Sequence, residues 1–396
     1  MSRFHSYLNS SSAILSAYDG SEPFASCLKK YFALNKKFGS RDRKTIAHLC
    51  YCSFRTGKLF SKDPLEDRVL KSLLLCSEGQ NEILEQLRPG WNSMSLMSAP
   101  EKYSLLSHGG RLDNIFPWTT ELSKGINAEE FALSFLIQPD LFLRIRPGYT
   151  QQVVRKLKDA GILFDLVTET CVRLSNSTKV EEVIEINKEA VIQDHSSQRI
   201  EKFLQDYKLK TTNNKLSIWD CCAASGGKSI LAIDTVGNIE LSVSDIRESI
   251  LINLRKRFKE AGITKYRSFL ADLTKPNLQP PTPDIDLIIA DVPCTGSGTW
   301  ARTPEQLYFF DEKKIDHYAE LQKKILTNIT GSMKPGSFLL YITCSVFKKE
   351  NEEAIAFLKK EFHLQCLKME SLIGYDKKAD TMFACLLQKS YPGAPS

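Results

Sequence analysis

A short apolar segment followed by a turn of small residues constrains the fold of this 396-residue chain more than any other feature. Leu216–Asp220 is predicted to be a buried strand, and Cys222–Ser229 supplies small residues that let the backbone approach a ligand before a helix begins. After that helix, Leu241–Asp245 is predicted to be the next strand, with a carboxylate at its tip. In nucleotide-binding α/β folds an acid roughly 20 residues past the glycine loop holds ribose hydroxyls. The pattern therefore predicts a nucleoside pocket.

A phosphate-binding P-loop is the nearest alternative for this turn. Gly227-Lys228-Ser229 copies the end of that motif. The first glycine of a P-loop, however, would fall at Cys222. The alternative therefore fails at the position where the turn is tightest.

Two cysteines follow two further apolar segments. Cys294 comes shortly after the predicted strand 284–291. Cys344 follows the apolar segment 338–342, with one residue between the segment and the cysteine. With a helix predicted over 249–262, strands and helices alternate as in a mostly parallel sheet, which binds ligands at the carboxyl ends of its strands. A cysteine in this place is more often a small buried residue than a nucleophile. The adjoining aspartate, proline and glycines nevertheless favour thiol chemistry.

Together the three segments resemble the motifs of the RNA (cytosine-5)-methyltransferases, S-adenosylmethionine-dependent enzymes of the bacterial Sun/Fmu ribosomal RNA type and their eukaryotic relatives. In that family a D-x-C-A-A-P-G-G-K-T loop, a D-A-P-C-S-G-x-G strand end and a T-C-S segment occur in this order. The likeness runs from about residue 135 to the C-terminus and includes Gln193–Gln198 and Glu350–Glu352. Ser225, Val292 and Thr295 depart from the family pattern by small or isosteric changes, and no reactive group is lost. The resemblance implies a class I methyltransferase fold, α/β and Rossmann-like, with a mostly parallel seven-stranded sheet.

The reaction that the resemblance implies requires a thiolate, because C5 of cytosine attacks a methyl sulfonium only after a thiolate has added to C6. We expect Cys344 to be that nucleophile and Cys294 to assist proton removal from C5 and release of the adduct. Asp291 is expected to contact N3 and the exocyclic amine of the base. Lys228 is expected to lower the pKa of the thiolate or to hold Asp291 in place.

The same resemblance implies S-adenosylmethionine as the cofactor. Asp272, which follows Leu270 and Ala271, is expected to contact the adenine amine or a neighbouring cofactor atom. The expected cofactor-binding residues are Cys222, Ala223, Ala224, Ser225, Gly226, Gly227, Lys228, Asp245, Asp272 and Asp291.

Three domains are predicted. Residues 1–130 form a helical domain, in which Ser40–Lys44 and Arg55 are weakly similar to the helical RNA-binding domain of some Sun/Fmu proteins. Residues 131–200 form a small α/β, RRM-like module, and residues 201–396 form the methyltransferase domain. Arg144 and Arg146 share one strand face of the small module, a geometry suited to RNA phosphates.

Composition sets the remaining expectations. The 11 cysteines, an odd number without an export signal, indicate a reducing compartment, which we take to be the cytoplasm. No apolar run approaches the ~20 residues of a membrane span. Cys50 and Cys52 lack the further cysteine or histidine ligands of a zinc site, so no metal is expected. The net charge of +6 is mild, and an RNA-binding surface must therefore be a local patch.

These observations favour an enzyme, expected to be monomeric, that methylates C5 of a cytosine in structured RNA, with ribosomal RNA as the first choice of substrate. Transfer RNA is the alternative substrate. A non-catalytic RNA-binding or assembly factor that retains the cofactor pocket is the alternative function. An amino-methyltransferase acting on N4 or N6 would need an N/D-P-P-Y strand end, where this chain has a cysteine.

Overall fold

The computed structural model describes residues 2–107, 112–211, 215–276, 280–282 and 284–391. They form two compact units, which are treated separately. The helical unit comprises Met1–Thr120, Asn127–Gln138 and Thr299–Glu312, and the sheet unit comprises Glu121–Ile126, Pro139–Gly298 and Lys313–Ser396. Within the described ranges no helix is both long enough and apolar enough to cross a membrane.

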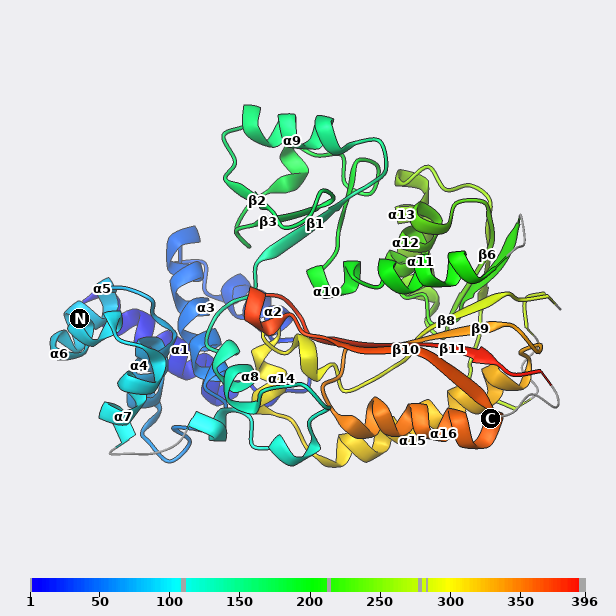
Figure 1. Ribbon diagram of the computed structural model, residues 1–396. Coiled ribbons are helices and arrows are strands. Elements are labelled where there is room, and N and C mark those ends of the chain that lie inside the picture. The colour runs from blue at the N-terminus through cyan, green and yellow to red at the C-terminus, as the bar shows by residue number, and fades with distance from the viewer. Residues whose placement is uncertain (1, 108–111, 212–214, 277–279, 283, 392–396) are drawn as a thin grey trace. The chain divides into compact units, whose positions relative to one another are not determined.

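The helical unit encloses a core of aromatic and aliphatic side chains. Its N-terminal helices, which the sequence pattern predicts, are drawn in blue and cyan in Figure 1. Local capping starts two of its helices: the Ser2 side chain accepts a hydrogen bond from the backbone of α1, and the Asn127 side chain does the same for α8. The rings of Phe24 and Phe54 meet edge to face at 4.9 Å in the core. Its helices are α1 Arg3–Ala17, α2 Phe24–Leu34, α3 Ser40–Arg55, α4 Leu65–Cys76, α5 Glu82–Leu87, α6 Pro89–Asn92, α7 Ala99–Ser107, α8 Ala128–Ser134 and α14 Pro304–Tyr308, with short 3-10 turns at Ser93–Leu96 and Leu112–Ile115.

Residues 299–312 pack in the helical unit, although the sequence analysis places them in the methyltransferase domain. The Phe309 ring lies 5.4 Å from the Tyr18 ring, and the Glu305 carboxylate accepts a hydrogen bond from the Phe24 N–H at 3.3 Å. Aromatic side chains from a segment far along the chain thus complete this core, which a pattern read along the sequence does not reveal.

A small antiparallel sheet opens the sheet unit, with strands in the order β2-β3-β1-β4. Its strands β2 and β3 form an antiparallel hairpin, and β3 pairs in turn with β1. The hydrophobic side of this sheet packs against Val153 and Leu157 of its helix. The elements are β1 Leu141–Ile145, α9 Thr150–Asp159, β2 Phe164–Leu166, β3 Cys171–Leu174 and β4 Ala190–Ile192.

The main sheet confirms the predicted class I methyltransferase fold. Its seven strands lie in the order β10-β11-β9-β8-β5-β6-β7, and the run from β9 to β7 is parallel. The strands are β5 Leu216–Asp220, β6 Ile239–Asp245, β7 Arg267–Leu270, β8 Leu287–Asp291, β9 Phe338–Thr343, β10 Leu364–Leu372 and β11 Met382–Lys389. The helices are α10 His195–Gln198, α11 Glu201–Lys210, α12 Gly227–Val236, α13 Glu248–Glu260, α15 Lys313–Gly331 and α16 Glu352–Phe362.

Alternate residues of the central strands face opposite sides of the main sheet, and helices cover both faces (Figure 1). Leu340 and Ile342 of β9 belong to the core beneath α11, α12 and α13. Leu339 and Tyr341 belong to the core beneath α15 and α16. Burial on both faces leaves the strand ends as the place where polar side chains gather.

Candidate functional site

Four neighbouring parallel strands of the main sheet end at or next to an aspartate. Asp291, Asp220 and Asp245 are the last residues of β8, β5 and β6, and Asp272 lies two residues past β7. Because the carboxyl ends of parallel strands share one edge of the sheet, these four carboxylates line that edge. Three of them were expected from the sequence to contact a ligand.

The loop between β5 and α12 is shaped for close approach of a ligand to the backbone. Ala224 and Gly226 both have positive φ, 45° and 83°, which is costly for alanine and free for glycine. A Cβ at Gly226 would lie 2.5 Å from Phe258 Cε1, so only glycine fits there. Gly226 immediately precedes α12, whose first N–H groups are directed at the loop.

Asp245 is fixed by the loop that it faces. Its Oδ2 accepts a hydrogen bond from the Ala224 N–H at 3.1 Å, and its Oδ1 accepts from the Arg247 N–H at 3.0 Å. Asp272, at the neighbouring strand end, accepts from the Thr274 hydroxyl at 2.6 Å, which lowers the pKa of the Asp272 carboxyl. Hydrogen bonds thus fix the orientation of both acids at the strand ends where the sequence predicts cofactor contacts.

Asp220 belongs to the same row of acids, but the sequence analysis did not select it. It is completely buried; its Oδ2 accepts from the Ser229 hydroxyl at 2.6 Å, and its Oδ1 has no hydrogen-bond partner among the described residues. Burial raises the pKa of Asp220 to about 7. Its position at the tip of a strand, like that of Asp245, was the signal that could have identified it.

Lys228 and Asp291 form an ion pair across the site. Lys228 Nζ, on the first turn of α12, lies 3.1 Å from Asp291 Oδ2, at the end of β8. Both side chains are mostly buried, 12% and 29% exposed. Of the two roles expected for Lys228, this geometry supports the one in which it holds Asp291 in place.

The two predicted reactive cysteines lie side by side. Cys294 Sγ and Cys344 Sγ are 3.3 Å apart, although 50 residues separate them in the sequence. They follow β8 and β9, which pair in parallel with Asp291 opposite Ile342. The hydrogen bond with the Cys344 sulfur, together with burial, raises the pKa of the Cys294 thiol. The arrangement presents two thiols to one small target.

The expectation that Arg144 and Arg146 face RNA phosphates is contradicted. Arg144 Nη1 lies 2.7 Å from Asp234 Oδ2, and Arg146 Nη2 lies 2.9 Å from Asp234 Oδ1, with 4% and 13% of the two arginine side chains exposed. The two arginines do share a strand face, but that face is directed at α12. Both guanidinium groups form ion pairs with Asp234 of that helix. Arg55 is likewise buried, and its Nη1 donates to the carbonyl oxygens of Phe135, Ile137 and Ala301.

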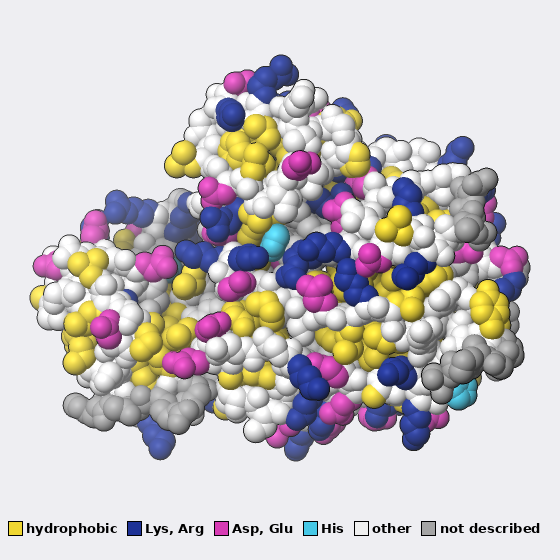
Figure 2. All heavy atoms as spheres, viewed as in Figure 1, with side chains coloured by type: hydrophobic (Ala, Val, Ile, Leu, Met, Phe, Trp, Pro, Cys, Tyr) yellow, Lys and Arg dark blue, Asp and Glu magenta, His cyan; other side chains and the backbone are white. Residues whose placement is uncertain are grey.

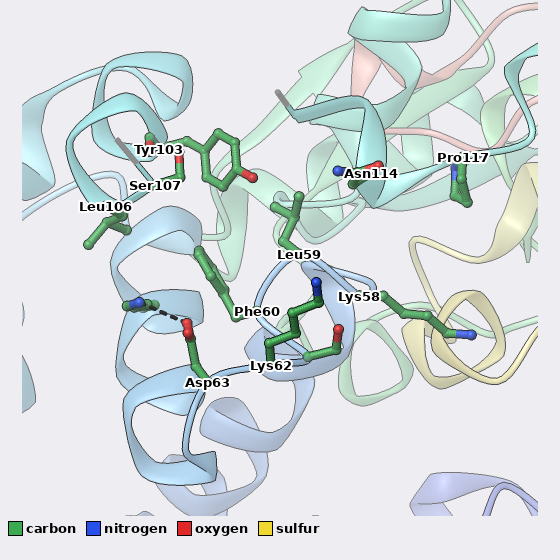
Figure 3. A pocket seen from close by; sticks show the side chains of 12 residues that line it. Lys58, Leu59, Phe60, Lys62, Asp63, Tyr103, Leu106, Ser107, Asn114 and Pro117 are labelled. Atoms are coloured by element: carbon green, nitrogen blue, oxygen red, sulfur yellow. Dashed lines mark hydrogen bonds and ion pairs between the residues drawn. The ribbon is translucent and has the colours of Figure 1, made fainter. Parts of the chain in front are cut away.

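The helical unit contains a cavity of about 540 Å³ that does not belong to this site (Figure 3). Tyr103 and Phe60 form part of its wall, and Lys71 bonds to Asp63 at 2.7 Å on one side. None of the residues predicted to bind cofactor or react lies among its described lining residues.

The comparisons with known proteins confirm the resemblance over the C-terminal half of the chain, residues 206–393. Residues 206–393 match the family described as 16S rRNA methyltransferase RsmB/F. Ribosomal RNA small subunit methyltransferase B of Klebsiella pneumoniae is 32% identical over 165 residues, which are 42% of this chain and 37% of that protein. A probable enzyme of the same name from Synechocystis is 31% identical over 165 residues, 41% of this chain and 36% of that protein. The chain thus spans well under half the length of these curated relatives.

Solved structures support the fold over a larger part of the chain. The crystal structure of PH0851 matches with a TM-score of 0.69 at 16% identity and covers 98% of this chain and 99% of that one. A methyltransferase homologue from Pyrococcus horikoshii matches with a TM-score of 0.55 at 20% identity, covering 72% of this chain and 97% of that one.

Proposed function

Because residues 206–393 match the RsmB/F methyltransferase family, we propose that this protein transfers a methyl group from S-adenosylmethionine to C5 of a cytosine in structured RNA, with ribosomal RNA as the expected substrate. The observation that carries the proposal is the 3.3 Å approach of Cys294 Sγ and Cys344 Sγ at two neighbouring strand ends.

The residues at the strand ends fit the proposed cofactor. The loop at Ala224 and Gly226 lets a ligand touch the backbone, and we propose that Asp245, which bonds to that loop, accepts hydrogen bonds from ribose hydroxyls. Asp272, at the next strand end, suits the adenine side. When bound there, S-adenosylmethionine supplies an electrophilic methyl group.

The cysteines are proposed to divide the work on the base. Cys344 Sγ forms a bond to C6 of cytosine, and the electron pair displaced from the C5–C6 double bond makes C5 nucleophilic. Asp291, held by Lys228, accepts a hydrogen bond from the exocyclic amine and passes the proton lost by the Cys344 thiol to N3, where negative charge develops. After C5 is methylated, Cys294 assists removal of the C5 proton, the Cys344–C6 bond breaks, and the ring regains its double bond.

The substrate assignment also draws on charge. C6 is inaccessible inside a helix, so the target base must leave its stack, which requires the protein to hold the surrounding backbone. Figure 2 shows Lys and Arg side chains gathered on the face of the sheet unit over α10. With a net charge of only +6, such a local patch is where phosphate contacts are expected.

Methyl transfer to RNA that lacks the modification tests the proposal. Labelled S-adenosylmethionine is incubated with total RNA and with wild-type protein or Cys344→Ala, followed by separation of ribosomal from transfer RNA and nucleoside analysis. Label in 5-methylcytidine of ribosomal RNA with wild type alone is expected. Label in 5-methylcytidine of transfer RNA instead would show that transfer RNA is the substrate. Measurable cofactor binding without transfer to any RNA would favour a non-catalytic RNA-binding factor.

A further inference from the structure

A single buried carboxylate contacts both cysteine loops. Thr295 directly follows Cys294, and Ser345 directly follows Cys344. The hydroxyls of these two residues both donate to Glu350 Oε1, each at 2.7 Å. Glu350 lies at the end of a short 3-10 turn, Lys348–Glu350, and is fully buried.

The second carboxylate oxygen binds the Cys294 loop through its backbone. Glu350 Oε2 accepts from the Thr295 N–H at 2.8 Å and from Gln322 Nε2 at 3.4 Å. Gln322 Nε2 also donates to the Pro293 carbonyl at 3.0 Å. Tyr341 holds the backbone of Glu350, since its hydroxyl donates to the Glu350 carbonyl oxygen at 2.5 Å. Among the described residues, the donors to the Glu350 carboxylate come from the two cysteine loops and from Gln322, which also holds the Cys294 loop.

Stability alone does not account for a carboxylate here. Burial raises the pKa of Glu350, so its charge is costly, and a well-packed apolar side chain would avoid that cost. What an apolar side chain could not do is accept hydrogen bonds from the residues after both cysteines at one oxygen atom. Because both hydroxyls donate to one oxygen atom of Glu350, these hydrogen bonds fix the separation of the two cysteine loops.

We propose that Glu350 is a positioning residue that sets the distance between Cys294 Sγ and Cys344 Sγ, so that both thiols reach the same pyrimidine ring. The inference rests on the proposed methyl transfer for its catalytic consequence, but the distance between the two sulfur atoms can be measured without any turnover.

Three variants alter the carboxylate bridge and leave both sulfurs in the chain. Thr295→Val and Ser345→Ala each remove one hydroxyl donor, and Glu350→Gln replaces one acceptor oxygen by a donor that opposes the Thr295 N–H. Thr330→Val is the matched control, because Thr330 is also buried and its hydroxyl bonds, among the described residues, to carbonyls of its own helix. Thermal unfolding of each variant shows whether the fold is retained.

The separation of Cys294 Sγ and Cys344 Sγ is measured with dibromobimane, a bifunctional alkylating reagent. Each of two neighbouring thiols displaces one bromide from the reagent and releases one proton. Peptide mass mapping then gives the yield of the Cys294–Cys344 bridge. Cys366 and Cys385, whose sulfurs are 3.4 Å apart between β10 and β11, form an internal reference pair in the same sample.

In the three bridge variants the yield of the Cys294–Cys344 product is expected to fall relative to the Cys366–Cys385 product. The kcat is expected to fall at least about tenfold with KM unchanged, because a misplacement of about 1 Å can cost 10²-fold. An unchanged ratio of the two products, or an equal effect in Thr330→Val, would overturn the inference. If the wild type methylates no RNA, the proposed function fails while the product ratio still decides the role of Glu350.

Discussion

Asp220 shows how one residue can carry a large electrostatic cost at a strand end. Its carboxyl group is fully buried, with one hydrogen bond from Ser229 and one oxygen that has no partner among the described residues. Unsatisfied buried polar atoms are uncommon in folded proteins, and they often lie where a ligand binds. Its position at the end of β5, directly before the cofactor loop, fits that explanation.

The first prediction concerns the pH dependence that Asp220 imposes. Burial raises its pKa from 3.8 to about 7, so between these values the folded chain holds a proton that the unfolded chain has released. Stability must then decrease as the pH rises through this window. Asp220→Asn cannot ionise, so wild type should lose free energy of unfolding relative to this variant from about pH 4 to about pH 7. Urea unfolding at several pH values measures the difference; parallel curves would contradict the assignment.

At the scale of elements, the strand–loop–helix unit explains why the site could be predicted. The strand ends at Asp245 and Asp291 and the loop at Gly226 depend on local pattern, and the parallel order of the strands then brings them together. Arg144 and Arg146 could not be assigned correctly, because their partner Asp234 lies 90 and 88 residues away. Glu350 was noticed as part of a motif, but its contacts with both cysteine loops depend on the fold.

The second prediction concerns Gly226 at the start of α12. Gly226→Ala puts a Cβ at a positive φ and against Phe258, so we expect a loss of about 1–3 kcal/mol in the free energy of unfolding and weaker binding of S-adenosylmethionine. Gly262→Ala is the control, since its φ is +72° but no atom lies within 4 Å of the added Cβ. Denaturant unfolding and cofactor titration compare the two. Equal losses would mean that the close approach to Phe258 has no role.

At the scale of the whole molecule, the sheet unit contains two sheets that are connected by buried ion pairs. Arg144 of β1 and Arg146, the residue after β1, both form ion pairs with Asp234 of α12, so the small antiparallel sheet is bound to the helix that follows the cofactor loop. Arg146 Nη1 also donates to the Ala261 carbonyl at 2.7 Å, just past α13. The small sheet is thereby fixed to α12 and to the residue after α13, on one face of the main sheet.

The third prediction follows from the ion pairs that Arg144 and Arg146 form with Asp234. Asp234→Ala leaves two buried guanidinium groups without their carboxylate and should cost about 3–5 kcal/mol in the free energy of unfolding. Asp165→Ala, which removes an exposed ion pair with Arg173 in the same small sheet, should cost about 1 kcal/mol or less. Denaturant unfolding of both variants checks the difference. Similar small losses of unfolding free energy in Asp234→Ala and Asp165→Ala would contradict the structural role of the ion pairs. If Arg146→Ala then also folded stably and bound RNA more weakly, the phosphate-binding interpretation would be restored.

The division of labour between two adjacent thiols is the central claim, and a covalent adduct tests it most directly. Cys294→Ala and Cys344→Ala are each incubated with S-adenosylmethionine and substrate RNA, and protein–RNA adducts are resolved on a denaturing gel. We predict a stable adduct with Cys294→Ala, in which C6 stays bonded to Cys344, and none with Cys344→Ala. An adduct with Cys344→Ala and none with Cys294→Ala would reverse the two roles, and the absence of any adduct from both variants would contradict covalent catalysis.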